Sequence, residues 1–244
     1  MNPGNPSTTA PPVWVMGAGS IGCYVGGLLA AAAQGGKVAA GVPAVTLIGR
    51  PRVLQAVGER GMALTAVDAA PQQVPPGALR LVAEPPACEG PAPLVLLAVK
   101  SGATANAAGQ LARVLPAGSL VLSLQNGVRN AEVAQVAAPA LRVLPAMVGF
   151  NVAELEPGHW HRGTQGALAV QLLDEVGLAD GAGVVEDLVA HGAGGRQALG
   201  RQHQAGGGHQ VLDLHLAHLL QRLALAGQGP QREAHGPHHE QGHH

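Results

Sequence analysis

The sequence predicts an α/β fold built on an open, doubly wound and mostly parallel sheet. Three observations support this class. Short apolar runs alternate with helical stretches through residues 13–148. A glycine loop, Gly17-x-Gly19-x-x-Gly22, follows the first run, and residues 93–100 form an apolar run that ends at Lys100. Ligands of such sheets bind outside the carboxyl ends of the strands, so the residues at these ends are the functional candidates.

The expected strands are short apolar runs that a parallel sheet would bury. They are residues 13–16, 44–48, 62–67, 93–100, 119–124 and 142–148. Helices are expected between them, at residues 20–34, 51–58, 103–115 and 130–138. Residues 34–42 are interpreted as a surface insertion. Residues 68–92 are interpreted as a Pro-rich connection that contains one strand candidate, 78–83.

The glycine loop is the first candidate site. Between a strand and a helix, glycines let the backbone approach a pyrophosphate, and the helix N-terminus offers unpaired N–H groups and the positive end of its dipole. Gly17, Ala18, Gly19, Ser20, Ile21 and Gly22 make up this loop. The alternative is a tight turn without a ligand, which a chain rich in glycine can contain by chance.

The end of the second strand bears on which dinucleotide the loop would hold. An Asp or Glu there would accept a hydrogen bond from the ribose 2′-hydroxyl of NAD. The sequence instead has Arg50 and Arg52, and a guanidinium suits the 2′-phosphate of NADP. NADP is therefore favoured, with solvated loop charges as the alternative.

Two further polar residues follow buried strands. Lys100 ends the run at 93–100, and Asn126 lies in the turn after 119–124. An ammonium group and an amide at neighbouring strand ends could both contact a bound cofactor, and the amide could also contact a carbonyl substrate. A strand-ending lysine and an Asn-Gly turn are the structural alternatives.

Composition restricts the partners. The net charge is −1 without basic runs in the first two thirds, which argues against nucleic acid. Cys23 and Cys88 have no metal-ligand spacing, which fits a reducing cytoplasm, and we expect Cys23 to be buried. Residues 13–36 are uncharged and long enough to span a bilayer, but five glycines between Gly17 and Gly27 disfavour a membrane helix. Residues 1–12 are expected to be a disordered leader.

The character of the chain changes at about residue 174. Ten of the twelve histidines follow residue 190, and no lysine follows Lys100. We expect residues 174–244 to form an atypical segment, with a helix at about 209–226 and a disordered tail at 227–244. A shifted reading frame is one hypothesis and a genuine divergent segment is the other; the base sequence of the gene separates them. The His-rich tail is expected to hold no physiological metal.

Five motifs resemble, in order, the N-terminal domain of the ketopantoate reductase (2-dehydropantoate 2-reductase) family. They are GAGSIGCYVGG, VTLIGR, LLAVKS, SLQNGV, and PAMVGFNV through HRGTQGALAV. The resemblance covers about residues 13–171, and we take 13–173 as the domain. It implies a Rossmann-like domain that binds NADPH and reduces 2-dehydropantoate, a 2-oxo acid, to pantoate on the route to pantothenate.

The resemblance also implies roles for individual residues. Residues 17–22 would hold the pyrophosphate and Arg50 the 2′-phosphate. Lys100 would contact the cofactor, Asn126 both cofactor and substrate, and Asn151 the cofactor site. His159 and His161, expected on one face of a strand, would have no catalytic role.

The family continues into a helical domain whose lysine protonates the developing alkoxide, and no residue of this sequence matches that lysine. Two functions therefore remain: an NADPH-dependent reductase, and a non-catalytic NADP-binding module. A membrane protein is the third alternative. The oligomeric state is open, with a homodimer as one alternative.

Overall fold

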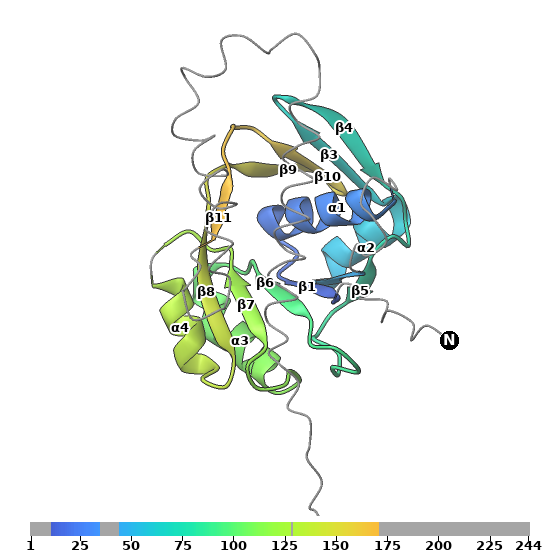
Figure 1. Ribbon diagram of the computed structural model, residues 1–244. Helices are drawn as coiled ribbons and strands as arrows, with labels where there is room; N and C mark the ends of the chain where they lie inside the picture. Colours follow the sequence, from blue (N-terminus) through green and yellow to red (C-terminus); the bar gives the residue numbers. More distant parts are fainter. Residues whose placement is uncertain (1–10, 35–43, 128, 171–244) are drawn as a thin grey trace, which may run out of the picture.

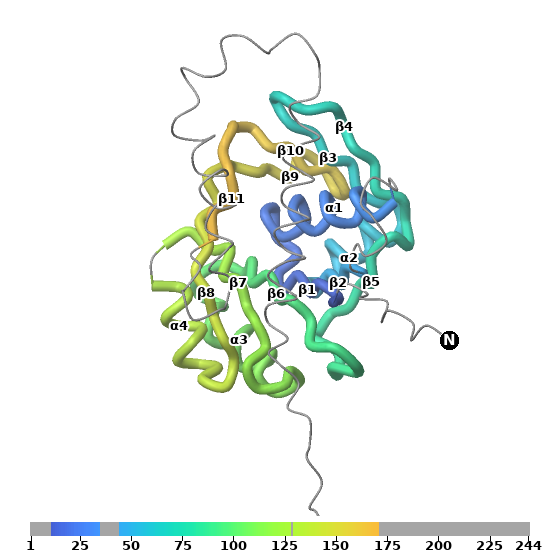
Figure 2. Tube along the Cα trace, viewed as in Figure 1, coloured from blue at the N-terminus to red at the C-terminus, as the bar shows by residue number. Residues whose placement is uncertain are grey.

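A computed structural model describes residues 11–34, 44–127 and 129–170. In these ranges the chain forms a seven-stranded sheet and a four-stranded sheet, and helix α1 (Ser20–Gln34) lies between the two (Figures 1 and 2). The predicted leader, the predicted insertion after residue 34 and the segment 174–244 fall wholly or almost wholly outside the described residues.

The larger sheet has the strand order β11-β8-β7-β6-β1-β2-β5. Its strands are β1 (Val13–Met16), β2 (Val45–Ile48), β5 (Arg80–Val82), β6 (Leu94–Leu97), β7 (Leu120–Ser123), β8 (Arg142–Val148) and β11 (Leu168–Val170). All neighbours pair in parallel except β11, which runs antiparallel to β8. The chain moves outward from β1 through β2 on one side and from β6 through β7 on the other. The strand order therefore reverses between β1 and β6, where ligands of such sheets bind.

Continuous apolar strands bury both faces of this sheet. Every residue of β1, β2, β6 and β7 is buried. Alternate side chains enter two cores: Val13 and Val15 pack with α1 and with α2 (Pro51–Arg60), whereas Trp14 and Met16 pack with α3 (Thr104–Ala112) and α4 (Asn130–Ala137). Helices on both faces confirm the predicted doubly wound α/β fold.

A second sheet covers the outer side of α1. Its order is β4-β3-β10-β9, made of β3 (Met62–Ala66), β4 (Ala69–Val74), β9 (Val152–Glu156) and β10 (His159–Arg162). A Cβ atom added to Gly27 would lie 2.9 Å from a methyl group of Leu64, so the helix lies close against this sheet. The interpretation of residues 68–92 as a mere connection is wrong for β4, which pairs with β3 despite Pro71 because it is an edge strand with an exposed proline.

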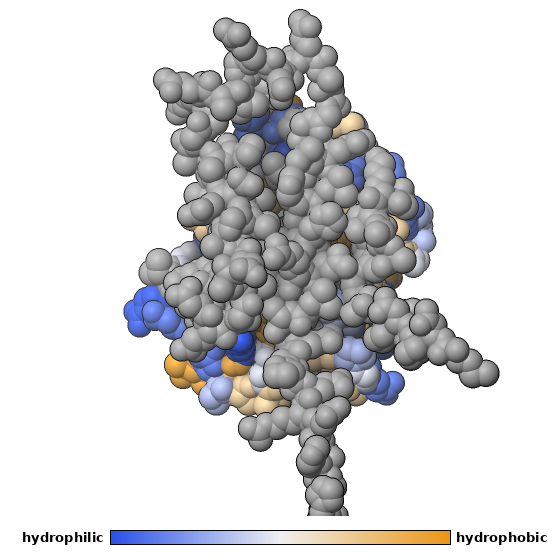
Figure 3. Space-filling model, in the orientation of Figure 1, coloured by the Kyte–Doolittle hydropathy of each residue, from blue (hydrophilic) through white to orange (hydrophobic). Residues whose placement is uncertain are grey.

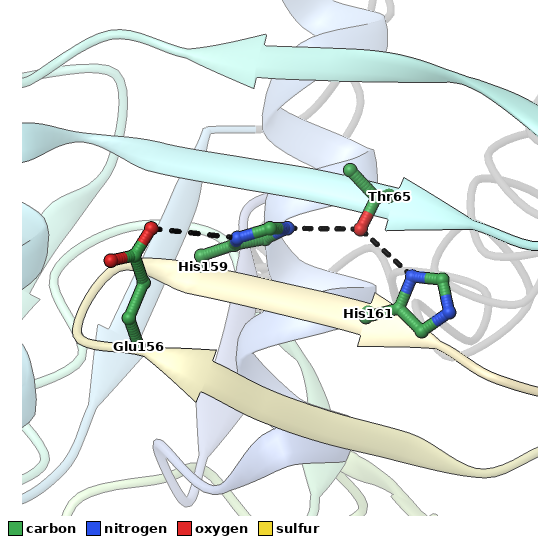
Figure 4. A network of polar contacts seen from close by, with 4 residues as sticks. All are labelled: Thr65, Glu156, His159 and His161. Atoms are coloured by element: carbon green, nitrogen blue, oxygen red, sulfur yellow. Dashed lines mark hydrogen bonds and ion pairs between the residues drawn. The ribbon is translucent and has the colours of Figure 1, made fainter.

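The face of the second sheet turned away from α1 carries two histidines. Figure 4 shows Thr65 of β3 between His159 and His161 of β10; its Oγ1 lies 2.9 Å from His159 Nε2 and 2.9 Å from His161 Nδ1. A hydroxyl has one proton to donate, so at most one of the two ring nitrogens accepts from Thr65, and at least one donates to it. This confirms that the two histidines share one face of a strand and ties β10 to β3.

The face of β10 turned towards α1 holds a buried ion pair. Arg162 Nη2 lies 2.6 Å from Asp68 Oδ1, and both side chains are largely buried. The Arg162 guanidinium also stands over the Phe150 ring, 5.8 Å from its centroid, and Phe150 packs edge-on against Tyr24 of α1. These contacts join the second sheet to the helix that borders the larger one.

Some apolar side chains lie outside both cores. Val133 and Val136 of α4 are exposed, the latter by 82%, and apolar surface is visible beside α4 in Figure 3. Across the described residues, no helix combines the length and apolar character needed to cross a membrane.

We predict that the two cysteines differ sharply in reactivity. Burial, with a smaller contribution from the charge of Glu154, raises the pKa of the Cys23 thiol to about 12, whereas Cys88 is partly exposed. Since the thiolate is the nucleophile, iodoacetamide at about pH 8 should alkylate Cys23 at least about tenfold more slowly than Cys88. Peptide mass spectrometry of the native protein measures this, and the same reaction in denaturant should equalise the two. Equal rates in the native protein would contradict the burial of Cys23.

Candidate functional site

A cleft of about 490 Å³ opens at the carboxyl ends of β1, β2, β5 and β6. The loops that follow these strands provide its walls: residues 16–19, 48–51, 83–84 and 98–100, with Ala103. The cleft thus spans the point where the strand order reverses, which is where the fold predicts a ligand site.

Two glycines of the β1–α1 loop are required by packing. Gly17 has φ +120°, and a Cβ atom there would lie 2.7 Å from the carbonyl carbon of Ala98. A Cβ atom on Gly22 would collide with the carbonyl oxygen of Gly17. The loop therefore turns sharply and lies directly on the end of β6, which no larger residue at either position permits.

Gly19 is different, because it has free space. The nearest atom to a Cβ placed on it is the Ala98 oxygen at 3.9 Å, which is ordinary van der Waals contact. Gly19 is exposed and lines the cleft. A methyl group at this position would leave the protein packing intact and project into the space available to a ligand.

Helix α1 begins directly after this glycine. Cys23 N donates to the Gly19 oxygen at 2.8 Å, which closes the first helical turn. The N–H groups of Ser20, Ile21 and Gly22 lie within that turn, where helices have no internal acceptor for them. The Ile21 side chain packs against the core, so any contribution of this residue to the site is through its backbone.

The two arginines after β2 have separate positions. Arg50 precedes α2, is exposed and lines the cleft. Arg52 Nη2 instead lies 3.7 Å from Glu154 Oε2 of the second sheet. Arg50 is therefore the guanidinium available at the cleft.

Lys100 lines the same cleft from the end of β6. It immediately precedes the short 3-10 helix η1 (Ser101–Ala103), and its side chain is exposed. The structure thus brings together three of the predicted features: the first half of the glycine loop (residues 17–19), Arg50 and Lys100.

A buried glutamine fixes the turn that carries Lys100. Gln125 Nε2 donates to the Val99 oxygen at 2.8 Å and to Thr104 Oγ1 at 2.7 Å, and its Oε1 accepts from Ser123 Oγ at 3.1 Å. Gln125 therefore links the end of β7 to both sides of η1. Sequence reasoning missed this role, although Gln125 is adjacent to Asn126 in the SLQNGV motif.

The two predicted asparagines lie outside the cleft lining. Asn126 is exposed after β7, and its carbonyl accepts from Asn130 Nδ2 at 2.9 Å. Asn151 lies between β8 and β9, where its N–H donates to Thr164 Oγ1 at 2.9 Å. Their roles in cofactor or substrate binding stay predictions.

Glu84 is a cleft residue that sequence reasoning also missed. It follows β5 and is exposed at the rim. The available signal was its place just after the strand candidate 78–83, the one strand proposed inside the Pro-rich connection.

The chemistry of the cleft suits an elongated anionic ligand. The N-terminus of α1 favours negative charge, and Arg50 and Lys100 provide cations on either side of it. The glycines of the loop offer a surface without side chains: Gly17 and Gly22 have no room for a Cβ atom, and Gly19 has room for one but carries none. A dinucleotide, with a pyrophosphate at its centre, fits these features.

Comparison with known proteins gives a consistent result. The sequence pattern of the family described as Ketopantoate reductase PanE/ApbA matches residues 13–175. A 2-dehydropantoate 2-reductase of Halobacterium salinarum is 39% identical over 147 residues, which are 60% of this chain and 44% of that protein. The enzyme of the same name from Pyrococcus abyssi is 35% identical over 118 residues, 48% of this chain and 34% of its own length.

A solved structure supports the same relationship. The PanE/ApbA family ketopantoate reductase of Ralstonia eutropha superposes with a TM-score of 0.57 at 34% identity, over 69% of this chain and 52% of that one. This chain thus matches about half of the length of these relatives, or less.

We predict that Gln125→Leu destabilises the protein. The change leaves the Val99 carbonyl and two hydroxyls without their buried partner, at a cost of about 2–4 kcal/mol, which corresponds to roughly a 5–15 °C lower melting temperature. Thermal unfolding followed by circular dichroism measures the shift. Gln165→Leu, at an exposed glutamine, is the matched control. A shift no larger than that of the control would show that the hydrogen bonds of Gln125 do not hold the turn.

Proposed function

Because the chain belongs to the ketopantoate reductase PanE/ApbA family, we propose that it binds NADPH and reduces 2-dehydropantoate to pantoate. The family and the named relatives support an oxidoreductase of the kind used in pantothenate biosynthesis. We propose the identity of the coenzyme, the identity of the substrate and the turnover of both by this chain.

One observation carries it: the glycine loop, Arg50 and Lys100 line one cleft at the strand-order reversal. The pyrophosphate of the coenzyme would lie across Gly19, at the N-terminus of α1, because Gly19 is the loop glycine with free space. Arg50 would bind the 2′-phosphate through charge-assisted hydrogen bonds. Lys100, on the opposite side of β1, would face the other part of the coenzyme.

The reaction needs a hydride and a proton. When bound, NADPH would supply the hydride to the ketone carbon, and the ketone oxygen would need a proton. A positioned acid for this step typically contributes about a hundredfold to ten-thousandfold in rate. The proposal assigns coenzyme binding to residues of the described part of the chain, and it assigns proton donation to none of them.

A second candidate is a module that binds NADP without turning it over. The observation that favours it is the absence of any lysine after Lys100, since the family resemblance places the acid lysine in that part of the chain. The two candidates share the same coenzyme site and differ only in the acid. We further propose the cytoplasm as the compartment, on the basis of two cysteines without metal or disulfide spacing.

We predict that the full chain binds NADPH and oxidises it when 2-dehydropantoate is added. Binding is measured by the fluorescence of NADPH, and turnover by the loss of its absorbance. A reaction without the 2-oxo acid is the control. Binding without turnover would exclude the reductase and support the binding module, and an absence of binding would exclude both.

We also predict that two glycine substitutions separate binding from folding. Gly19→Ala should weaken NADPH binding at least about tenfold, because a methyl group takes the place of the pyrophosphate, yet lower the melting temperature by no more than about 4 °C. Gly22→Ala is the matched comparison: its methyl group collides with the Gly17 carbonyl, so about 1–3 kcal/mol of stability should be lost as well. Wild-type affinity in the Gly19→Ala variant would show that the coenzyme does not cross this loop.

A further inference from the structure

Arg50 and Glu84 occupy equivalent positions on neighbouring strands. β2 and β5 pair in parallel with Ile48 opposite Val82, and Gly49 N donates to the Val82 oxygen at 3.1 Å. Arg50 and Glu84 each lie two residues beyond that pair, so the two chains leave the sheet side by side. Both residues line the cleft.

Among the described residues that line this cleft, Glu84 is the one that is acidic. Its ionisable companions there are Arg50 beside it and Lys100, which lies beyond β1 at the end of β6. Within the described residues, neither Arg50 nor Glu84 belongs to an ion pair, whereas Arg52 is engaged with Glu154. The Glu84 carboxylate therefore stands beside the cation assigned to the 2′-phosphate without being neutralised by it.

The two coenzymes respond differently to such a carboxylate. A phosphate monoester carries a charge of about −1.5 to −2 at neutral pH, so the 2′-phosphate of NADPH is repelled by a nearby carboxylate. The 2′-hydroxyl of NADH is neutral and donates a hydrogen bond to a carboxylate in many dinucleotide sites. Arg50 and Glu84 thus favour opposite coenzymes.

We propose that Glu84 determines coenzyme specificity together with Arg50, and that it lowers the preference of this cleft for NADPH over NADH. The inference rests on the proposed coenzyme site. Arg50 attracts the 2′-phosphate, Glu84 repels it, and the difference between them sets the ratio of the two affinities. Both side chains are exposed, so solvent and salt screen the effect and limit it to about three- to tenfold.

The test uses Glu84→Gln in the full chain, with NADPH and NADH titrated separately by fluorescence on the same preparation. We expect NADPH to bind about three- to tenfold more tightly than to the wild type, while NADH binds equally or more weakly. The gain should shrink at about 0.5 M salt relative to 0.05 M salt, because salt screens exposed charges. The ratio of the two dissociation constants does not depend on the fraction of folded protein.

Glu89→Gln is the matched control. Glu89 is also exposed, but it does not line the cleft. Its substitution by Gln removes the same charge from the same connection. It should leave both affinities within about twofold of the wild type. A gain equal to that of Glu84→Gln would show an effect of net charge alone and overturn the proposal.

Two other outcomes overturn it as well. If the ratio of the NADPH and NADH dissociation constants is unchanged in Glu84→Gln, the carboxylate does not interact with the group at the 2′-position. A ratio shifted towards NADH would show that Glu84 supports Arg50 instead of opposing it. In both cases the wild type binds coenzyme and the proposed function stands, whereas a wild-type chain that binds neither coenzyme overturns the proposed function and this inference together.

Discussion

The close contact between the β1–α1 loop and the end of β6 determines the geometry of the whole cleft. Gly17 lies against the backbone of Ala98 and Val99, and Gly22 lies against Gly17, so no side chain separates the loop from the strand or the helix from the loop. This contact directs the N-terminus of α1 at the cleft, and Lys100, two residues after Ala98, lines the same cleft. Gly49 adds a similar contact from β2, because a Cβ atom there would collide with Ala18. The ends of β1, β2 and β6 therefore lie in close contact with one another.

The second sheet packs against the helix that follows this loop. Gly27 brings α1 against Leu64, Trp160 is almost completely buried in the same core, and Arg162 carries its charge into the interior with Asp68 as partner. A buried ion pair gains little net stability over apolar packing, but breaking it by removing one partner costs about 3–5 kcal/mol. Its position between two sheets makes it a determinant of how the second sheet docks on α1. The position of the helix N-terminus thus depends on residues far from the cleft.

The sequence predicted the parts of this structure that depend on local patterns. The buried strands at 93–100 and 119–124 and the glycine loop followed from apolar runs and glycine spacing, because such runs are buried wherever they occur. The second sheet was not predictable in this way, since the Thr65 hydroxyl meets a histidine 96 residues further along the chain. Gln125 was missed because its three partners belong to β7, to the β6 end and to α3. Glu84 was missed because only the pairing of β5 with β2 places it beside Arg50.

Coenzyme binding and catalysis are separable in the function that we propose for this chain. In that proposal the dinucleotide is bound by the start of the glycine loop, Arg50 and Lys100, which line the cleft together with other residues between 16 and 103. Turnover would further require an acid near the ketone oxygen, whereas the proposal assigns the lysine of this cleft to the coenzyme. Tight binding of the coenzyme is therefore no measure of turnover, because the two depend on different groups. In the proposal, a reductase and a binding module differ in one proton donor, and both would use the same cleft.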